Sequence, residues 1–440
     1  MNTRHIAPKL NVSGTIRVPG DKSISHRSLI FSALAPGTSR INNILNSADV
    51  RATARVLNAL GATIPELTDS FDVHGARHDR LLSPPNALDC ANSGTTARLM
   101  MGLVAGLDGR HARFTGDTSL SKRPMRRVSQ PLTAMGARFD FENGEGHFGL
   151  PVQLFGARLH TLNWHNEHSS AQVKSAILLA ALVSGVEAAV TEPHRSRDHT
   201  ERMLQARGVN IDVNDGSVRI MQDQSLSALD VDVPGDPSSA TFFVALAALS
   251  GSGRLRLVDV CLNPSRIGAL MALRRMGAVV QLEDERTAGG EPVGTIVVSA
   301  GTLVSTEISG EEIPALIDEL PMIACVATRA DGETRVTGAS ELRVKESDRI
   351  TAVVDNLRAI GADADELPDG FVVRGNQRTL AGRVVTFGDH RLAMAFGILA
   401  ALPGNNIVID NPGCVDVSFP AFWKELHAAT HSSRSVHGTP

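Results

Sequence analysis

Two stretches that lie far apart, HSSAQVKSAILLAAL at residues 168–182 and PSSATFFVALAAL at residues 237–249, decide the fold of this chain. Each contains two serines and continues as an apolar segment with the length of a helix. Serine is a preferred helix N-cap, because its hydroxyl accepts a hydrogen bond from a backbone N–H group that has no partner within the helix. A helix that is apolar on nearly every side is normally buried all round. The two stretches therefore predict buried helices with polar N-termini.

The same arrangement of a polar start and an apolar helix-like segment occurs six times. The residues that mark the six starts are 68 to 80 residues apart: Lys22, Gly94, Ser170, Ser238, Asp318 and His390. Ser, Asn, Asp and Gly cap helix N-termini, where N–H groups and the positive end of the helix dipole favour anions. For any one start, a cap on a core helix is the simpler interpretation. Six recurrences, each with the apolar segment on the same side, favour a common face that binds anions.

A second repeated pattern marks helix ends along the chain. The pattern Leu-x-x-x-Gly-Ala/Val, which is typical of a helix closed by glycine and continued by an extended segment, occurs at Leu57–Ala62, Leu132–Ala137, Leu204–Val209, Leu273–Ala278 and Leu357–Ala362. The segment 419–427 can supply a sixth helix. We therefore expect an α/β fold built from six βαβαββ units of about 70 residues each.

A duplicated tetrapeptide indicates where the chain divides. Val-Pro-Gly-Asp occurs at residues 18–21, before the first unit, and again at 233–236, before the fourth. Pro and Gly suit a chain that crosses between two bodies. We expect one three-repeat domain at 21–234 and a second at 235–440, to which residues 1–19 are added through a strand near Thr15–Val18.

Composition excludes several classes of protein. The chain has 440 residues, a formal net charge of -4, 42% hydrophobic residues and 4% aromatic residues, with no Tyr. This balance argues against a protein that coats nucleic acid. The longest apolar run, 176–183, is too short to span a membrane, and the first residues have no apolar signal-peptide region. Four well-separated cysteines predict neither a disulfide framework nor a zinc site. We expect a cytoplasmic protein without nucleic-acid or membrane partners.

Two charged motifs carry candidate chemistry. The first start, GDKSISHRSL, brings Lys22, Ser23 and Arg27 to the beginning of a helix, but it is not a P-loop because Asp21 stands where Gly must precede the Lys. The segment ELRVKESDR at 341–349 would align its Lys and its last Arg on a helix that began there. A solvated face is the commoner meaning of such a charge run. The presence of an aspartate at 318 and of Asp-His-Arg at 389–391 in the same half favours a functional site, although a buried capping His is an equal alternative.

The motifs PGDKSISHRSL, NSGTTARL, SLSKRP, SSAQVKSA, SRDHTE, LIDELP, LRVKESDR and GDHRLAMA, in that order, resemble the 5-enolpyruvylshikimate-3-phosphate synthase family. The resemblance extends to about Leu426. It implies the two-domain enolpyruvyl transferase fold, in which each domain has three βαβαββ repeats and the helix N-termini face an interdomain cleft that holds the active site. It also implies a 3-phosphoshikimate 1-carboxyvinyltransferase of the shikimate pathway. Such an enzyme transfers the enolpyruvyl group of phosphoenolpyruvate to the 5-hydroxyl of shikimate 3-phosphate and releases phosphate.

The resemblance also implies the roles of individual residues. Shikimate 3-phosphate would be bound by Lys22, Ser23, Arg27, Ser170, Ala171, Gln172, Arg197, Asp318 and Lys345. Phosphoenolpyruvate would be bound by Lys22, Gly94, Arg123, Gln172, Arg349, His390 and Arg391. The implied catalytic groups are Asp318 as base for the hydroxyl, Glu346 as proton donor to the methylene carbon, and Lys22 in proton transfer. We expect no metal, no cofactor and a monomer whose only partners are these two substrates.

One departure and two rivals qualify this interpretation. One branch of the family has a phosphoenolpyruvate-contacting Lys where this chain has Val417, so that contact is absent or made by another group. The related UDP-N-acetylglucosamine enolpyruvyl transferase usually carries a Cys on the loop after its second repeat's helix, and residues 108–127 contain none. A phospho-ligand binding protein without catalysis would not need the carboxylates at 318 and 346.

Overall fold

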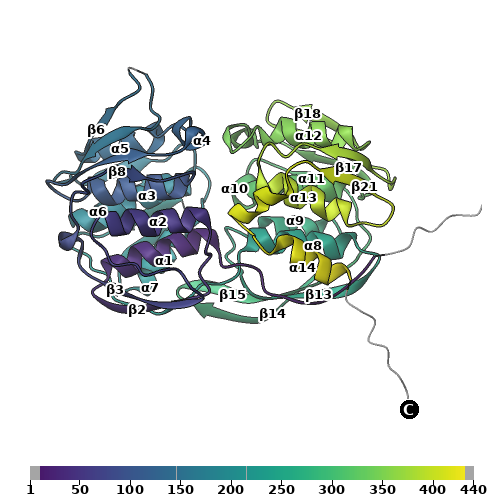
Figure 1. The fold of residues 1–440 in the computed structure, drawn as a ribbon, viewed down its shortest axis with the longest axis horizontal. Helices are drawn as coiled ribbons and strands as arrows, with labels where there is room; N and C mark the ends of the chain where they lie inside the picture. The colour runs from purple at the N-terminus through teal and green to yellow at the C-terminus, as the bar shows by residue number, and fades with distance from the viewer. Residues whose placement is uncertain (1–9, 145, 215, 432–440) are drawn as a thin grey trace, which may run out of the picture. The chain divides into compact units, whose positions relative to one another are not determined.

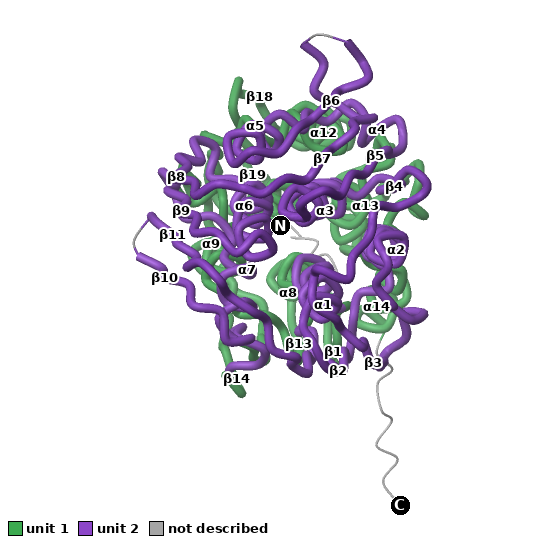
Figure 2. The backbone as a smooth tube through the Cα atoms, turned by 90° about the vertical axis from the view of Figure 1, so that its left-hand side faces the viewer, with its two compact units in different colours: residues 1–19, 235–286, 293–440 green, residues 20–234, 287–292 purple. Residues whose placement is uncertain are grey.

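The chain forms two compact units in a computed structural model, which describes residues 10–144, 146–214 and 216–431. Unit 2 contains Gly20–Pro234 and Thr287–Pro292, and unit 1 contains 10–19, Gly235–Arg286 and 293–431 (Figure 2). The expected second domain included 287–292, but this hairpin tip groups with unit 2 instead. Residues 1–9 and 432–440 of the expected ranges lie outside the described residues.

Unit 2 contains three groups of elements (Figure 1). The first group is α1 (Lys22–Leu34), β2 (Gly37–Asn42), α2 (Ala48–Ala59), β3 (Ser70–Gly75) and the short η1 (His78–Arg80). The second is β4 (Leu88–Asp89), α3 (Gly94–Ala105), β5 (His111–Thr115), α4 (Thr118–Ser121), α5 (Arg126–Met135), β6 (Arg138–Phe141) and β7 (Val152–Phe155). The third is β8 (Leu162–His165), α6 (Ala171–Ser184), β9 (Ala188–Thr191), α7 (His199–Ala206), β10 (Ile211–Asn214), β11 (Ser217–Ile220) and, after it, β12 (Val231–Asp232).

The second and third groups are the predicted βαβαββ units. Their sheets have the orders β4-β5-β7-β6 and β10-β11-β9-β8, with the first two strands of each unit parallel and the other pairs antiparallel. The first group differs, because its sheet has the order β12-β2-β3 and the described segment between α2 and β3 forms no strand. Pro65 lies in that segment and has no N–H to donate to a sheet.

Unit 1 contains the remaining elements (Figure 1). Its first group is β1 (Asn11–Ile16), α8 (Pro237–Leu249), β13 (Ser252–Cys261), α9 (Gly268–Arg275), β14 (Val279–Ala288) and β15 (Glu291–Ser299). Its second is β16 (Glu307–Ile308), α10 (Ile313–Leu316), η2 (Ile317–Glu319), α11 (Leu320–Ala327), β17 (Gly332–Val336), η3 (Ser340–Val344), α12 (Arg349–Ala359), β18 (Asp363–Leu367) and β19 (Gly370–Gly375). Its third is β20 (Ala381–Val384), α13 (His390–Ala400), β21 (Asn406–Ile409), η4 (Pro412–Val417) and α14 (Phe422–Thr430).

The first strand of one repeat in each unit is supplied by exchange along the chain. β1 precedes α1 in sequence but pairs in parallel with β13 of unit 1, and β12 precedes α8 but pairs in parallel with β2 of unit 2. The chain crosses at the two Val-Pro-Gly-Asp segments. A Cβ at Gly20 would overlap the carbonyl oxygen of Asn43, and one at Gly235 would lie 2.7 Å from a methyl group of Val18. Glycine is therefore needed at both crossings, where backbone and neighbour approach closely.

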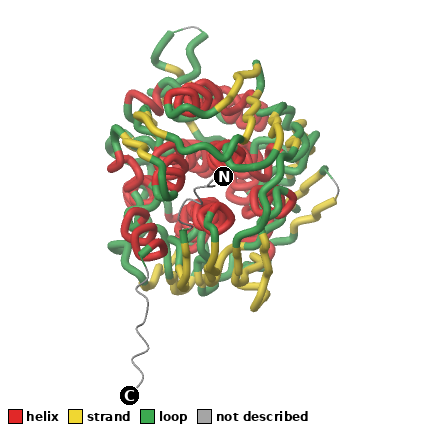
Figure 3. Tube along the Cα trace, turned by 90° about the vertical axis from the view of Figure 1, so that its right-hand side faces the viewer, coloured by secondary structure: helices red, strands yellow, loops and turns green. Residues whose placement is uncertain are grey.

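The predicted buried helices and glycine-closed ends are confirmed. α8 is buried from Pro237 to Ala248 and α6 from Val173 to Val183, and Figure 3 distinguishes the helices (red) from the strands (yellow). The glycines of the five Leu-x-x-x-Gly patterns have φ between 85° and 120°, a region that favours glycine. The sixth helix is α14, anchored by Phe422, whose ring packs 6.0 Å from that of Phe242 and 5.9 Å from that of Phe243. Among the described residues, no helix has the length and apolar character needed to cross a bilayer.

Candidate functional site

The start of α1 gathers three cationic or polar candidates in unit 2. Asp21 caps the helix by accepting a hydrogen bond from the backbone N–H of Ile24 at 2.8 Å. Lys22 is the first helical residue, and its ammonium group pairs with the carboxylate of Asp49. Ser23 comes next, and its carbonyl accepts a hydrogen bond from Arg27 at 2.9 Å. This helix start therefore holds two cations within its first two turns.

Arg27 is buried, with 3% of its surface exposed, and donates only to uncharged oxygens. Its Nε donates to the hydroxyl of Thr200 and its Nη2 to the hydroxyl of Ser175, both at 2.7 Å. Burial lowers the pKa of Arg27 to about 10, against the opposing effect of nearby Glu201, and the positive charge of Arg197 adds to the lowering. Arg197 lies in the loop between β9 and α7. A buried guanidinium with neutral partners is well suited to bind an anion.

His26 lies between these cations and stays neutral. It is completely buried, and its Nδ1 is 2.7 Å from the hydroxyl of Thr53. Burial, together with the positive charges of Lys22 and Arg27, lowers the pKa of His26 to about 3, although Asp49 opposes this. Thr53 in turn bonds to Thr96 at 2.7 Å, which links α1, α2 and α3 through a buried polar chain.

The start of α3 holds Gly94 beside two arginines. A Cβ at Gly94 would lie 2.8 Å from Nη1 of Arg98 and 3.5 Å from Nη1 of Arg123. Arg98 donates to the side-chain oxygen of Gln172 at 2.6 Å, and Gln172 donates to the hydroxyl of Thr95 at 3.0 Å. The structure thus brings Gly94, Arg123 and Gln172 together around Arg98, and the resemblance assigns those three residues to one subsite. Arg98 was not predicted as a site residue, although it lies one helical turn after Gly94 within the motif NSGTTARL.

The start of α6 holds Ser170, Ala171 and Gln172. Ser170 is the N-cap residue, but its side chain makes no capping hydrogen bond. Its carbonyl instead accepts a hydrogen bond from the side-chain amide of Asn166 at 3.0 Å. The predicted unit 2 residues for shikimate 3-phosphate therefore lie on α1, on the start of α6, and in the loop before α7.

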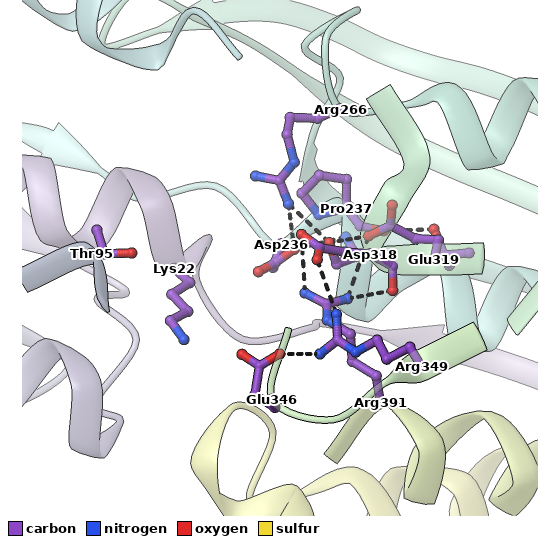
Figure 4. A network of polar contacts seen from close by, with 12 residues as sticks. Lys22, Thr95, Asp236, Pro237, Arg266, Asp318, Glu319, Glu346, Arg349 and Arg391 are labelled. Atoms are coloured by element: carbon purple, nitrogen blue, oxygen red, sulfur yellow. Dashed lines mark hydrogen bonds and ion pairs between the residues drawn. The ribbon is translucent and has the colours of Figure 1, made fainter. Parts of the chain in front are cut away.

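Arg349 is the centre of the candidate site in unit 1 (Figure 4). Its Nε donates to Asp389 at 2.7 Å, its Nη2 to Glu346 at 2.7 Å and its Nη1 to Asp318 at 3.3 Å. The Arg349 side chain is 1% exposed, whereas those of Asp318 and Glu346 are 14% and 32% exposed. One buried guanidinium thus orients both predicted catalytic carboxylates.

Charge compensation explains how Arg349 and Asp389 are buried together. Burial disfavours the charged form of each group, but the neighbouring carboxylates outweigh it and raise the pKa of Arg349. Burial likewise would raise the pKa of Asp389, but the charge and hydrogen bond of Arg349 lower it overall. Asp389 also caps α13 by accepting from the backbone N–H of Arg391 at 2.9 Å. The pair therefore fixes the start of α13.

The next two residues of α13 are predicted site residues. His390 is 6% exposed and begins the helix. Arg391 donates to the carbonyl of Asp318 at 3.1 Å and to the carboxylate of Glu319 at 3.5 Å (Figure 4). The Arg391 and Arg349 guanidinium groups therefore both contact residue 318.

Two details of the sequence interpretation are corrected. Lys345 does not align with Arg349 on one helix, because Asp348 caps the backbone N–H groups of residues 350 and 351 and α12 begins only at Arg349. Asp318 lies in the 3-10 turn η2 between α10 and α11 rather than acting as a helix cap.

The fourth start, to which the sequence assigned no substrate or catalytic role, joins this network. Asp236 caps α8 and accepts from Arg266 at 3.1 Å, and the hydroxyl of Ser238 donates to Glu319. Val417, where one branch of the family carries Lys, ends η4 and is 36% exposed. In the part of the chain that the structure describes, no group of three or more His, Cys, Asp or Glu side chains is arranged to hold a metal ion.

Comparison with known proteins gives a consistent result. The family model described as EPSP synthase (3-phosphoshikimate 1-carboxyvinyltransferase) matches residues 6–426. A 3-phosphoshikimate 1-carboxyvinyltransferase of Sulfurihydrogenibium sp. (strain YO3AOP1) is 44% identical over 419 residues, which cover 94% of this chain and 96% of the relative. The protein of the same name from Bacillus subtilis (strain 168) is 43% identical over 421 residues, which cover 96% and 98%. An EPSP synthase structure from Acinetobacter baumannii superimposes with a TM-score of 0.86 at 37% identity, covering 96% of this chain and 97% of that one.

Proposed function

This chain belongs to the EPSP synthase family, and from that premise we propose that it transfers the enolpyruvyl group of phosphoenolpyruvate to the 5-hydroxyl of shikimate 3-phosphate. Inorganic phosphate is the second product. The reaction is a step of the shikimate pathway, which leads to chorismate and the aromatic amino acids.

The observation that carries the proposal is the contact of one guanidinium, that of Arg349, with two carboxylates of unequal exposure. An addition that protonates a carbon and deprotonates a hydroxyl needs an acid and a base held in fixed positions. We assign the base to Asp318, the less exposed carboxylate, and the proton donor to Glu346. Lys22, at the start of α1, takes part in proton transfer.

The positively charged arginines complement the negative charges of both substrates. Arginine binds phosphate and carboxylate groups through parallel hydrogen bonds, and the two substrates together carry two of each. We propose that shikimate 3-phosphate is bound by Lys22, Ser23, Arg27, Ser170, Ala171, Gln172, Arg197, Asp318 and Lys345. We propose that phosphoenolpyruvate is bound by Lys22, Gly94, Arg123, Gln172, Arg349, His390 and Arg391, and that Arg98 supports Gln172 in this subsite.

The proposed reaction has two steps. In the first, Glu346 protonates C3 of phosphoenolpyruvate while the 5-hydroxyl oxygen attacks C2 and gives its proton to Asp318, which forms a tetrahedral intermediate. In the second, the bond from C2 to the phosphate oxygen breaks, the Glu346 carboxylate takes a proton back from C3, and the carbon–carbon double bond is restored. The proton held by Asp318 goes to the departing phosphate, so both carboxyl groups return to their starting states. The atoms of both substrates are then accounted for in the enolpyruvyl ether and inorganic phosphate.

Phosphate release from phosphoenolpyruvate tests the function. We expect release by the purified protein with shikimate 3-phosphate as acceptor and none with UDP-N-acetylglucosamine. Release only with the UDP-sugar would establish the rival transferase. Binding of both anions without release from either acceptor would establish a non-catalytic phospho-ligand binding protein.

The roles of the carboxylates are tested by Asp318→Ala and Glu346→Gln. Loss of a general acid or base typically costs 10²–10⁴-fold in rate, so we expect kcat to fall by about that factor in each. Asp355→Asn, an exposed aspartate on α12, serves as the matched control and should leave kcat unchanged. Near-normal turnover by Asp318→Ala with both substrates saturating would remove Asp318 from the role of base.

We also propose that the enzyme works as a monomer in the cytoplasm. All four cysteines are free thiols, three of them buried, which fits a reducing compartment. Sedimentation at the assay concentration and fractionation of the source cells test the two statements separately. A stable dimer, or activity recovered only outside the cytoplasmic fraction, would contradict them.

A further inference from the structure

Glu192, the first residue after β9, is a buried carboxylate on which several hydrogen bonds converge. Its side chain is 5% exposed. It accepts from the side-chain amide of Asn166 at 2.7 Å, from the ammonium of Lys174 at 2.9 Å, and from Ser196 through both the hydroxyl at 2.8 Å and the backbone N–H at 3.2 Å. All of these partners are donors, so only an acceptor with several lone pairs fits this position.

Each partner of Glu192 is coupled to a residue that we place in the shikimate 3-phosphate subsite. The Asn166 amide that donates to Glu192 also donates to the carbonyl of Ser170, at 3.0 Å. Ser196 immediately precedes Arg197. Lys174 lies in α6, one turn after Ser170, and its backbone N–H donates to the Ser170 carbonyl at 3.1 Å. One carboxylate therefore fixes the segment before α6 and the loop before α7.

The charge of Glu192 is compensated inside unit 2. Lys174 is 1% exposed and is shared between Glu192 at 2.9 Å and Glu201 at 2.8 Å. Burial lowers the pKa of the Lys174 ammonium, but the two carboxylates outweigh it and raise the pKa overall. A glutamine at 192 would keep the volume but lose the charge and put an NH₂ group in place of one oxygen that accepts from donors, of which the Lys174 ammonium and the Ser196 backbone N–H can only donate. At least one of the two loops would then lose its support.

We propose that Glu192 is a positioning residue for shikimate 3-phosphate, which it serves by holding Ser170 through Asn166 and Arg197 through Ser196. This inference rests on the proposed function. None of the contacts that the structure shows for Glu192 is to a residue placed around phosphoenolpyruvate. Its effect is therefore specific to one substrate.

Steady-state kinetics of Glu192→Gln tests the proposal. We expect the KM for shikimate 3-phosphate to rise at least tenfold, while the KM for phosphoenolpyruvate changes less than twofold. The matched control is Glu187→Gln. Glu187 lies at the other end of β9 and pairs with Arg219 at 3.0 Å, but it is bonded to neither loop. This control should leave both KM values unchanged.

A second variant covers the possibility that Glu192→Gln does not fold. Ser196→Ala removes the hydroxyl that lies 2.8 Å from both carboxylate oxygens of Glu192 and leaves the ion pair with Lys174 intact. We expect a smaller rise, about threefold, in the same KM. In the double variant the Ser196→Ala effect should vanish, because the two residues act through one contact.

The outcomes separate the two levels of the proposal. If the wild-type protein releases no phosphate with shikimate 3-phosphate, the proposed function fails. If the wild-type protein is active and Glu192→Gln raises both KM values equally, or lowers only the free energy of unfolding, the positioning role is overturned. Additive effects of Glu192→Gln and Ser196→Ala would overturn it as well.

Discussion

The two fully buried arginines of the candidate sites, Arg27 in unit 2 and Arg349 in unit 1, have opposite surroundings. Arg27 donates to two hydroxyl groups and a carbonyl, and burial lowers its pKa to about 10. Arg349 donates to three carboxylates, and these raise its pKa. The positive charge of Arg27 is therefore not balanced by any hydrogen-bonded carboxylate, whereas the charge of Arg349 is balanced by three.

The difference indicates a division of work between the units. A buried cation with neutral partners gains a countercharge when an anion binds, so Arg27 is suited to hold a substrate. A cation that already holds three carboxylates keeps them in fixed positions, so we propose that Arg349 orients Asp318 and Glu346 as well as contacting phosphoenolpyruvate. The family resemblance predicted that Arg349 binds phosphoenolpyruvate. Its contacts with Asp318 and Glu346 add a second, orienting role to that expectation.

The largest expected effect is on stability, from Arg349→Gln. This change leaves Asp389, which is 0% exposed, as a buried charge without its main partner. Breaking a buried ion pair by removing one partner costs about 3–5 kcal/mol, and we expect that loss in the free energy of unfolding measured with denaturant. Arg358→Gln on the same helix is the control. Arg358 is 52% exposed and pairs with Asp365, so its loss should cost about 0–1 kcal/mol. If Arg349→Gln and Arg358→Gln lowered the free energy of unfolding equally, the buried ion pairs of Arg349 would contribute no more to stability than an exposed pair.

The second effect is on binding, from Arg27→Gln. Because the hydrogen-bond partners of Arg27 are uncharged, its removal leaves no carboxylate without a hydrogen-bond partner, and we expect the free energy of unfolding to fall by about 1–3 kcal/mol. A hydrogen bond to a charged group contributes about 1.5–3 kcal/mol, so the Kd for shikimate 3-phosphate should rise about 10- to 100-fold. Isothermal titration measures it, with Arg55→Gln on the exposed face of α2 as control. A large loss of stability with unchanged affinity for shikimate 3-phosphate would mean that Arg27 stabilises the fold and does not bind this substrate.

The surroundings of Arg349 also show which features of the structure could be predicted from the sequence and which could not. The polar starts, the buried helices and the glycine-closed ends were predictable because capping and hydrophobic periodicity are local properties. The contacts of Arg349 were not, since residues 318 and 389 are distant in sequence and only the packing of η2, α12 and α13 brings them together. The placement of β1 with the second domain was predicted from the strand-like residues at 15–18, but the pairing of β12 with β2 was not, because those two strands are distant in sequence. Arg98 could have been found, because it lies one turn after Gly94 on a helix that the sequence predicted.

The third prediction concerns acid stability and separates the two units by pH. His26 has a pKa of about 3 in the folded state and about 6.5 when exposed, so the unfolded chain binds a proton first as the pH falls below 6.5. The stability that neutral His26 provides above pH 6.5 is therefore lost on acidification, by about 1.4 kcal/mol per pH unit. Denaturant unfolding between pH 6.5 and 4.5 should show this slope in the wild type, and a slope smaller by that amount in His26→Asn.

Asp389 provides the matched test in unit 1. Its pKa is lowered from 3.8, so its contribution is present above that pH and lost only as the pH falls below it. Asp389→Asn should therefore leave the slope between pH 6.5 and 4.5 unchanged, whatever its effect on absolute stability. If the dependence of unfolding free energy on pH changed in Asp389→Asn and not in His26→Asn, the acid sensitivity would come from unit 1 and the prediction for His26 would be wrong.

The smallest expected effect comes from Gly94→Ala. This variant tests whether the side chains of Arg98 and Arg123 can move to make room for a methyl group. The new Cβ would lie 2.8 Å from Nη1 of Arg98, the far end of a flexible side chain, so the guanidinium can shift by a few tenths of an ångström. We expect the KM for phosphoenolpyruvate to rise only about two- to fivefold, with no loss of stability. Gly102→Ala on the same helix is the contrast, because its Cβ would overlap the backbone of Ala176 in α6. It should lower the free energy of unfolding without selecting between substrates. If Gly94→Ala abolished phosphoenolpyruvate binding, the arginines of unit 2 would be as rigidly held as Arg349, and the contrast between the two units would rest on charge alone.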